Sequence, residues 1–175
     1  DCASSWVLPG DGAPGWYILP LNDDPGWIQA GPPVADGLSQ VYRHRANQFG
    51  PAYDVYYWAG SGEPVGLLGR AAAEPLLIGG PAELWGYAGN GEEWLTLWNV
   101  VSATTAPLSV QAHLYAGDGP PQVADGLGFS SAQWQPGDWF VQRHRFAAPG
   151  ETLETGLYDY VTLEKAGPTV KLPAR

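Results

Sequence analysis

The chain has 175 residues and a formal net charge of −10, with only eight Lys and Arg residues. A chain this acidic is a poor match for a nucleic-acid backbone or an anionic membrane surface, and we expect neither as a partner. Nine Trp, nine Tyr and four Phe exclude a solvated, disordered coil. The length predicts one medium domain or two small ones.

Turn-forming residues recur along the whole chain, where 24 Gly and 17 Pro separate short apolar runs. This pattern predicts an all-β fold, an antiparallel β-sandwich of jelly-roll or immunoglobulin-like kind, with two tandem β units as a variant. We expect an N-terminal arm over residues 1–15 and a small β unit over 16–80, packed on the main domain or separate from it. The β-sandwich domain is expected over 81–175.

Cys2 is the only cysteine, so an internal disulfide is excluded. Cys2 either forms a disulfide with another chain or is an unpaired thiol in the arm. The chain has no Met, even at position 1, which predicts a processed product or an excised fragment. No run approaches the roughly 20 apolar residues of a membrane span. We therefore expect an exported protein, extracellular or at the cell surface.

In the first 80 residues, apolar and aromatic runs predict strands, and Pro20 marks the first of them as an edge strand or a strand end. One short helical turn is expected over Arg70–Glu74, ended by Pro75. The predicted strands are Trp16–Leu21, Leu38–Arg45 and Tyr53–Trp58.

The second half of the chain has sharper strand signals. Asn90-Gly91 is a strong hairpin signal between two predicted strands, Glu83–Ala88 and Trp94–Val101. Leu108–Tyr115 alternates apolar and polar residues, which predicts a half-buried strand of an antiparallel sheet. Further strands are predicted over Trp139–Phe146, Leu153–Tyr158 and Val161–Lys165, with one more short strand around Val170.

Two short patterns occur twice. Ala35–Leu38 (ADGL) recurs as Ala124–Leu127, and Arg43–Arg45 (RHR) recurs as Arg143–Arg145. Tandem duplication of a β unit would explain both matches. Chance in a chain biased toward Gly and Pro explains them as well, and the sequence leaves the two readings open.

An ordered set of motifs covers about half of the chain: Leu95–Trp98, His113-Leu114, Ala124–Gly126, Trp134–Asp138, Gln142–Arg145 and Gly156–Asp159. With these motifs, residues 83–165 resemble the extracytoplasmic β-sandwich domain of bacterial polyprenol-phosphate-dependent membrane glycosyltransferases of the mannosyltransferase type. The resemblance implies a β-sandwich and an exported location. It implies no active site, because the chemistry of such enzymes would lie in a membrane portion that this chain lacks.

Four of the eight basic residues lie in the two RHR triplets. An Arg held against a sheet needs a carboxylate or water. The nearest candidate in sequence is the Asp of the preceding ADG turn, which predicts a bidentate clamp between turn and strand. The expected clamps join Asp125 to Arg143 or Arg145, and Asp36 to Arg43 or Arg45. A glycan- or phosphate-binding Arg patch is the alternative.

No constellation with catalytic chemistry is visible. His44, His113 and His144 lack metal-ligand spacing, and no G-x-S-x-G nucleophile elbow occurs. Glu92-Glu93, the pair a glycosidase would need, follows a turn where solvated charge is usual. We expect no enzyme activity and no cofactor. Calcium at the oxygen-rich Asp23-Asp24 turn is the one cofactor alternative.

The aromatic residues carry the functional prediction. Trp27, Trp58, Trp134 and Trp139 lie beside turns with polar neighbours. Either they cap the ends of the core or they are exposed in a binding patch, where sugar rings stack on indole faces. The sequence thus predicts a non-catalytic module that recognises glycan or cell-envelope polysaccharide. The alternative is a structural subunit that binds copies of itself in a filament or surface layer.

Overall fold

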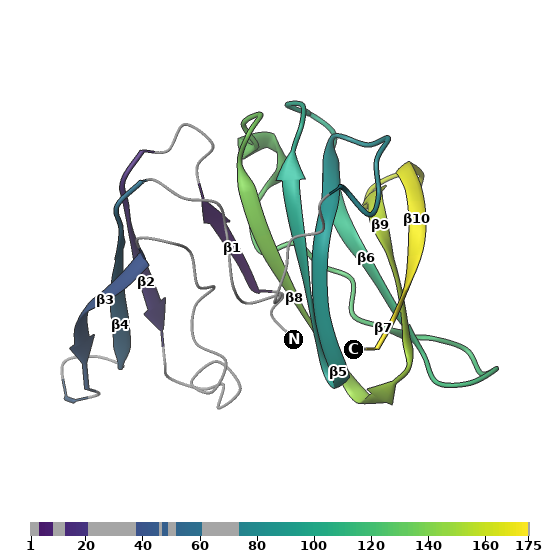
Figure 1. Cartoon of the computed structure of the whole chain (residues 1–175), viewed down its shortest axis with the longest axis horizontal. Helices are drawn as coiled ribbons and strands as arrows, with labels where there is room; N and C mark the ends of the chain where they lie inside the picture. Colours follow the sequence, from purple (N-terminus) through teal and green to yellow (C-terminus); the bar gives the residue numbers. More distant parts are fainter. Residues whose placement is uncertain are drawn as a thin grey trace. The chain divides into compact units, whose positions relative to one another are not determined.

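The computed structural model describes residues 4–8, 13–20, 38–45, 47–48, 52–60 and 74–174. Within these ranges the protein is all-β, with three antiparallel sheets (Figure 1). This confirms the predicted fold class. The chain divides into two compact units. Unit 1 contains Asp1–Gly10 and Leu68–Arg175, and unit 2 contains Asp11–Leu67. These bounds differ from the expected boundaries at residues 15 and 80.

Two sheets form the sandwich of unit 1. The first has the order β1-β8-β5, with β1 (Ser4–Leu8), β8 (Trp139–Gly150) and β5 (Ala82–Val100). The second has the order β10-β9-β6-β7, with β10 (Lys165–Pro173), β9 (Thr152–Asp159), β6 (Leu108–Tyr115) and β7 (Gln122–Val123). One short 3₁₀ helix, Ser131–Gln133, lies between β7 and β8.

Strand β5 folds back on itself near its middle. The amide of Val101 donates to the carbonyl oxygen of Pro81 at 2.9 Å, although 19 extended residues would span about 60 Å. The rings of Tyr87 and Trp94 stack at 6.2 Å, and Gly91 has a positive φ of 68°. The two arms of β5 are therefore the two strands of the hairpin predicted at Asn90-Gly91.

Alternation along the strands builds the core of unit 1. In β6, Val110, Ala112 and Leu114 are fully buried, and they belong to one cluster with large aromatic side chains of β5 and β8. Trp94, Trp98 and Phe140 are at most 1% exposed. Burying each such ring contributes more than burying an aliphatic side chain. The sandwich can therefore rest on its core, in a chain whose single cysteine allows no internal disulfide.

The chain passes from one sheet to the other at Gly150, which ends β8 just before β9 begins. A Cβ atom at this position would lie 2.4 Å from Cγ of Leu114. Because Leu114 is fully buried in the core, no residue with a side chain fits there without displacing it. Gly150 thus allows β8 and β9 to join the two layers closely.

Unit 2 contains one three-stranded sheet of order β2-β4-β3, with β2 (Gly15–Pro20), β4 (Tyr53–Trp58) and β3 (Leu38–His44). Register places Arg43 opposite Asp54. The guanidinium Nε and Nη2 atoms each donate to one carboxylate oxygen at 2.6 Å. This bidentate pair lowers the pKa of Asp54, chiefly through the hydrogen bonds from Arg43.

Several local predictions need correction. Residues 4–8 of the expected irregular arm form β1, which pairs antiparallel with β8. The predicted strand Val161–Lys165 is mostly a turn, and the strand expected around Val170 is the longer β10. Of the helical turn expected at Arg70–Glu74, only Glu74 is described, in a bend. In the described part of the chain, no helix is long and apolar enough to cross a membrane.

Candidate functional site

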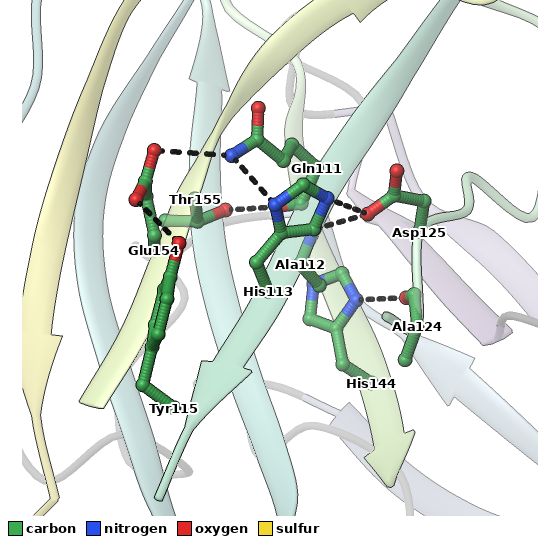
Figure 2. Close-up of polar contacts among 9 residues, drawn as sticks. All are labelled: Gln111, Ala112, His113, Tyr115, Ala124, Asp125, His144, Glu154 and Thr155. Carbon is green, nitrogen blue, oxygen red and sulfur yellow. Dashed lines mark hydrogen bonds and ion pairs between the residues drawn. The ribbon is translucent and has the colours of Figure 1, made fainter. Parts of the chain in front are cut away.

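The two repeated motifs meet in unit 1, through different atoms than predicted. His144, the centre of the RHR triplet on β8, has Nδ1 3.1 Å from the carbonyl oxygen of Ala124. Ala124 begins the ADG segment, which follows the edge of β6: its amide donates to Ala112, and the amide of Gly126 donates to Val110. The motifs thus join β8 in one sheet to the edge of the other (Figure 2).

A chain of buried hydrogen bonds determines which ring nitrogen of His144 carries the proton. Trp98 Nε1 donates to Oγ1 of Thr96 at 2.9 Å, and this hydroxyl lies 3.3 Å from His144 Nε2. Because Nδ1 faces a carbonyl, the neutral ring carries its proton on Nδ1 and accepts from Thr96 at Nε2. Burial lowers the pKa of His144 to about 4, against the opposing effects of the Ala124 carbonyl and Asp125. His144 is therefore neutral at pH 7.

Asp125 has partners on β6. Its Oδ1 atom accepts from the amide of Ala112 at 2.6 Å and lies 3.5 Å from Nε2 of His113. Arg143, the predicted partner, instead donates from Nη2 to Glu93 of β5 at 2.6 Å. Arg145 lies on the outer, exposed side of β8. The predicted pair of Asp125 with Arg143 is therefore wrong, and His144 joins the RHR strand to the ADG turn through the carbonyl of Ala124.

In unit 2 the carboxylate of Asp54 pairs with Arg43, and the clamp predicted between Asp36 and Arg43 or Arg45 stays a prediction. Asp36 lies outside the described residues. The two RHR triplets also differ in burial: Arg143 and His144 are buried, whereas Arg43 is exposed and His44 is half-buried. Side-chain placement therefore gives the two copies of the motif different structural roles.

The outer face of the second sheet carries a polar row (Figure 2). Nε2 of Gln111 donates to Glu154 and lies 3.4 Å from Nδ1 of His113. Tyr115 also donates to Glu154, at 3.2 Å, and burial is the main cause that raises the pKa of Tyr115. Lys171 lies 4.0 Å from the same carboxylate. These groups satisfy one another, so the row stabilises the sheet surface and offers few open bonds to a ligand.

Polar neighbours on both sides set the orientation of the His113 ring. Gln111 donates to Nδ1 of His113, so the neutral ring holds its proton on Nε2, toward Asp125. The ring is thus engaged at both nitrogens. Among the described residues, no group of three or more His, Cys, Asp and Glu side chains is arranged to hold a metal ion. The Asp23-Asp24 turn considered for calcium lies outside those residues, as does Cys2.

Two of the tryptophans predicted to bind a ligand belong to the interior. Trp58 is 2% exposed because it shares the inward face of β4 with Asp54 and Tyr56. Trp134 is 1% exposed, with its ring among Phe129 and Phe140. The ligand-binding role predicted for these two residues is therefore wrong, because both side chains are buried by packing.

The other two predicted tryptophans differ from this pair. Trp139 is half-buried and meets Trp85 edge to face at 5.7 Å. Its ring is partly accessible on the first sheet. Trp27 lies outside the described residues, so the proposed role of this side chain remains a prediction.

Exposed aromatic side chains gather on one face of the unit 2 sheet. Trp16, Ile18 and Tyr42 are 67%, 69% and 52% exposed. Register places them beside half-buried residues of the same face. We call this set the aromatic platform, and it consists of Trp16, Ile18, Tyr42, His44, Tyr53, Val55 and Tyr57.

Ring contacts hold the platform together. The rings of Trp16 and Tyr57 are 4.8 Å apart, and those of His44 and Tyr53 stack at 4.9 Å. Tyr42 lies 6.1 Å from Tyr53. The position of aromatic residues beside turns does not indicate this face. The available signal was the period-2 alternation of side chains along a strand. It places Trp16 and Ile18 on one face of β2. It likewise places Tyr53, Val55 and Tyr57 on one face of β4.

Comparisons with known proteins give no relative for this chain: no family model, no curated protein and no solved structure matches it. The resemblance of residues 83–165 to a glycosyltransferase-associated sandwich domain therefore stays a prediction. Any function has to be inferred from the geometry of the chain itself.

Proposed function

We propose that the protein is a non-catalytic, extracellular or cell-surface module that recognises glycan or cell-envelope polysaccharide through the aromatic platform of unit 2. The observation that carries this proposal is the solvent-exposed indole of Trp16, 67% exposed and packed against Tyr57. A large ring kept at the surface by a neighbouring ring presents a flat apolar face at little cost in side-chain entropy. The apolar C–H face of a sugar fits such a surface.

The polar atoms of the platform suit neutral hydroxyl groups. The set contains tyrosine hydroxyls and the imidazole of His44, and none of its seven members is a carboxylate, lysine or arginine. A hydroxyl-rich ligand can exchange hydrogen bonds with these groups without burying a charge. This supports an uncharged polysaccharide over an anionic one, which the net charge of −10 would also repel.

The dimensions of the platform favour a chain of sugars. Tyr53 and Tyr57 mark its two ends along β4, and four residues of strand span about 13 Å. This length exceeds one sugar ring. Contacts to several rings in sequence would provide useful affinity from individually weak stacking interactions.

A glycan array followed by titration of intrinsic Trp fluorescence tests the proposal. Trp16→Ala should abolish binding of the polysaccharides that bind the unaltered chain, and Trp16→Phe should retain part of it. Trp139→Phe is the matched control, because it removes an indole from unit 1 and leaves the platform intact. An array without hits, or equal binding by the Trp16→Ala variant, would contradict the proposal.

A further inference from the structure

Strand β1 is separated in the sequence from the rest of unit 1. The unit contains Asp1–Gly10 and resumes at Leu68, and all of unit 2 lies between these two parts. The other strands that the structure describes in unit 1, from β5 to β10, follow one another along the chain. In Figure 1 the purple β1 lies beside the green β8, with which it pairs antiparallel. Strand pairing, and not a short connection, therefore attaches β1 to the sandwich.

A backbone ladder of five residue pairs joins β1 to β8, from Ser4 opposite Arg143 to Leu8 opposite Trp139. Val7 is the β1 residue whose side chain the structure describes, and it is partly buried against the core cluster. Ladder hydrogen bonds connect main-chain atoms. The same strand from a second copy of the chain would therefore make them equally well.

The edge of β8 that receives β1 needs a partner strand. The opposite edge of β8 is already paired with β5. Phe140 and Val141 lie in the stretch that pairs with β1, and they are 1% and 5% exposed. Without β1, a row of unpaired main-chain donors and acceptors would lie along this apolar stretch, and such an edge binds other strands. Residues 4–8 are the strand that fits there in the structure.

The sequence of β1 contains no feature that opposes pairing with another copy. Residues 4–8 are Ser-Ser-Trp-Val-Leu, without a charged residue or a proline. Charged side chains and prolines are the residues with which natural proteins protect an edge strand from foreign strands. The segment itself therefore has nothing that would exclude it from the β8 edge of a second copy.

We propose that two copies of the chain exchange β1 reciprocally, so that residues 4–8 of each copy pair with β8 of the other. Every contact between β1 and β8 within one chain is then made between two chains. A closed pair fits better than an open series of copies, because an open series would leave one β8 edge empty at its end. This inference is independent of glycan binding.

The connection through unit 2 sets the concentration at which exchange competes with pairing inside one chain. A segment on a short flexible linker has an effective concentration on the order of 1 mM, and this value falls as the connection lengthens. The connection from β1 to the rest of unit 1 includes all of unit 2. We therefore expect monomer and dimer to reach equal amounts at or below about 1 mM.

A mixture of two cysteine variants of the full chain tests the exchange directly. Both variants carry Cys2→Ser, so the introduced thiol is the only one in each chain. One has Trp6→Cys and the other has Val141→Cys, at positions that lie opposite each other in the β1–β8 register, where the Cα separation suits a disulfide. Neither chain contains both cysteines, so a disulfide at this pair requires exchange.

In a glutathione redox buffer, we expect about tenfold more cross-linked heterodimer from this mixture than from a control mixture, because exchange holds the two thiols together. The control replaces Val141→Cys by Val123→Cys. Val123 is 62% exposed on β7 and pairs with β6, so its thiol reports random collisions. Cross-linking through Val141→Cys that is no more frequent than in the control would overturn the proposal.

A single chain with Cys2→Ser, Trp6→Cys and Val141→Cys provides a second test. When it is oxidised at high dilution, the disulfide holds β1 on β8 of the same chain. In sedimentation velocity up to about 1 mM, the oxidised chain should stay monomeric and the reduced chain should dimerise. Ser5→Cys with Gln142→Cys repeats the test at the adjacent pair and keeps Trp6. Oxidised and reduced chains that dimerise to the same extent would refute the exchange.

Discussion

His144 of β8 and Ala124 beside β6 are joined across the two layers of unit 1 by a 3.1 Å hydrogen bond from Nδ1 to a carbonyl oxygen. The same ring accepts from Thr96 on β5. One neutral imidazole therefore bridges three segments of chain inside a sandwich. Both hydrogen bonds depend on the tautomer of the His144 ring, so mutation or protonation of this ring should weaken them.

The first prediction concerns acid stability. The unfolded chain protonates His144 near its ordinary pKa of 6.5, whereas the folded chain does so near 4. The unfolded state thus binds the extra proton between these values, and stability falls as pH drops from 6.5 to 4, by about 3 kcal/mol in all. Urea unfolding at pH 7, 5 and 4 measures this loss. His144→Gln should flatten the pH dependence. Parallel pH profiles for the two chains would refute the assignment.

The second prediction concerns the hydroxyl of Thr96. Thr96→Val keeps the shape of the side chain but leaves Trp98 Nε1 and His144 Nε2 without their partner in the core. An unsatisfied buried polar group costs about 1–3 kcal/mol. We expect a loss of this size in the free energy of unfolding, measured in urea. Thr96→Ser is the control and should recover most of the stability. Equal losses for both variants would assign the effect to packing of the methyl group.

The third prediction concerns Gly150, where the chain changes sheets. A methyl group at this position meets the side chain of Leu114 at 2.4–2.9 Å. Overpacking of this kind costs about 1–3 kcal/mol, so Gly150→Ala should lower the melting temperature of unit 1. Gly119→Ala is the matched control, because only one atom lies as near as 4.0 Å to its added Cβ.

A double variant separates this clash from a general effect on the backbone at Gly150. In a chain that carries Leu114→Ala, the added methyl group at position 150 has room, so Gly150→Ala should cost much less stability there than in the unaltered chain. Equal costs in the two backgrounds would show that contact with Leu114 is not the cause.

The fourth prediction concerns Arg43 and Asp54. Asp54 is 2% exposed and its pKa is lowered, chiefly by hydrogen bonds from Arg43. The pair therefore stabilises unit 2 above the ordinary carboxyl pKa, and the contribution is lost as pH falls through the lowered value. Arg43→Ala should raise the pKa of Asp54, followed by NMR titration. Arg43→Lys should restore the shift only in part, since an ammonium cannot bind both oxygens in the same fork. An unchanged pKa of Asp54 in the Arg43→Ala variant would show that Arg43 does not lower this pKa.

Much of the architecture could be predicted from sequence because it depends on local signals. Alternation in Leu108–Tyr115 and the Asn90-Gly91 pair each indicated a strand or hairpin that the structure contains. Strand β1 was missed because a five-residue segment among Gly, Pro and Ser gains its structure from pairing with β8, more than 130 residues later. Such a tertiary contact has no local signature.

The side-chain partners were harder to predict than the strands. Asp125 is near Arg143 in sequence, but the arginine pairs instead with Glu93, which lies diagonally across from it on β5, two residues before its register partner Leu95. For Arg43, the register of β3 against β4 selects Asp54. Proximity along the chain is a poor guide in a sheet, where a partner is set by pairing across strands. Exposure of aromatic residues was missed for the same reason, since it depends on which face of a sheet another layer covers.

Strand β1 has a consequence for biogenesis. Residues 4–8 leave the ribosome long before Trp139–Arg143, the residues with which they pair. Until β8 is made, this segment has no ladder to join, although the whole length of unit 2 has been synthesised by then. Completion of the sandwich in unit 1 is thus a late event that requires most of the chain. A translation pause before residue 139 should prolong the time during which residues 4–8 have no strand to pair with.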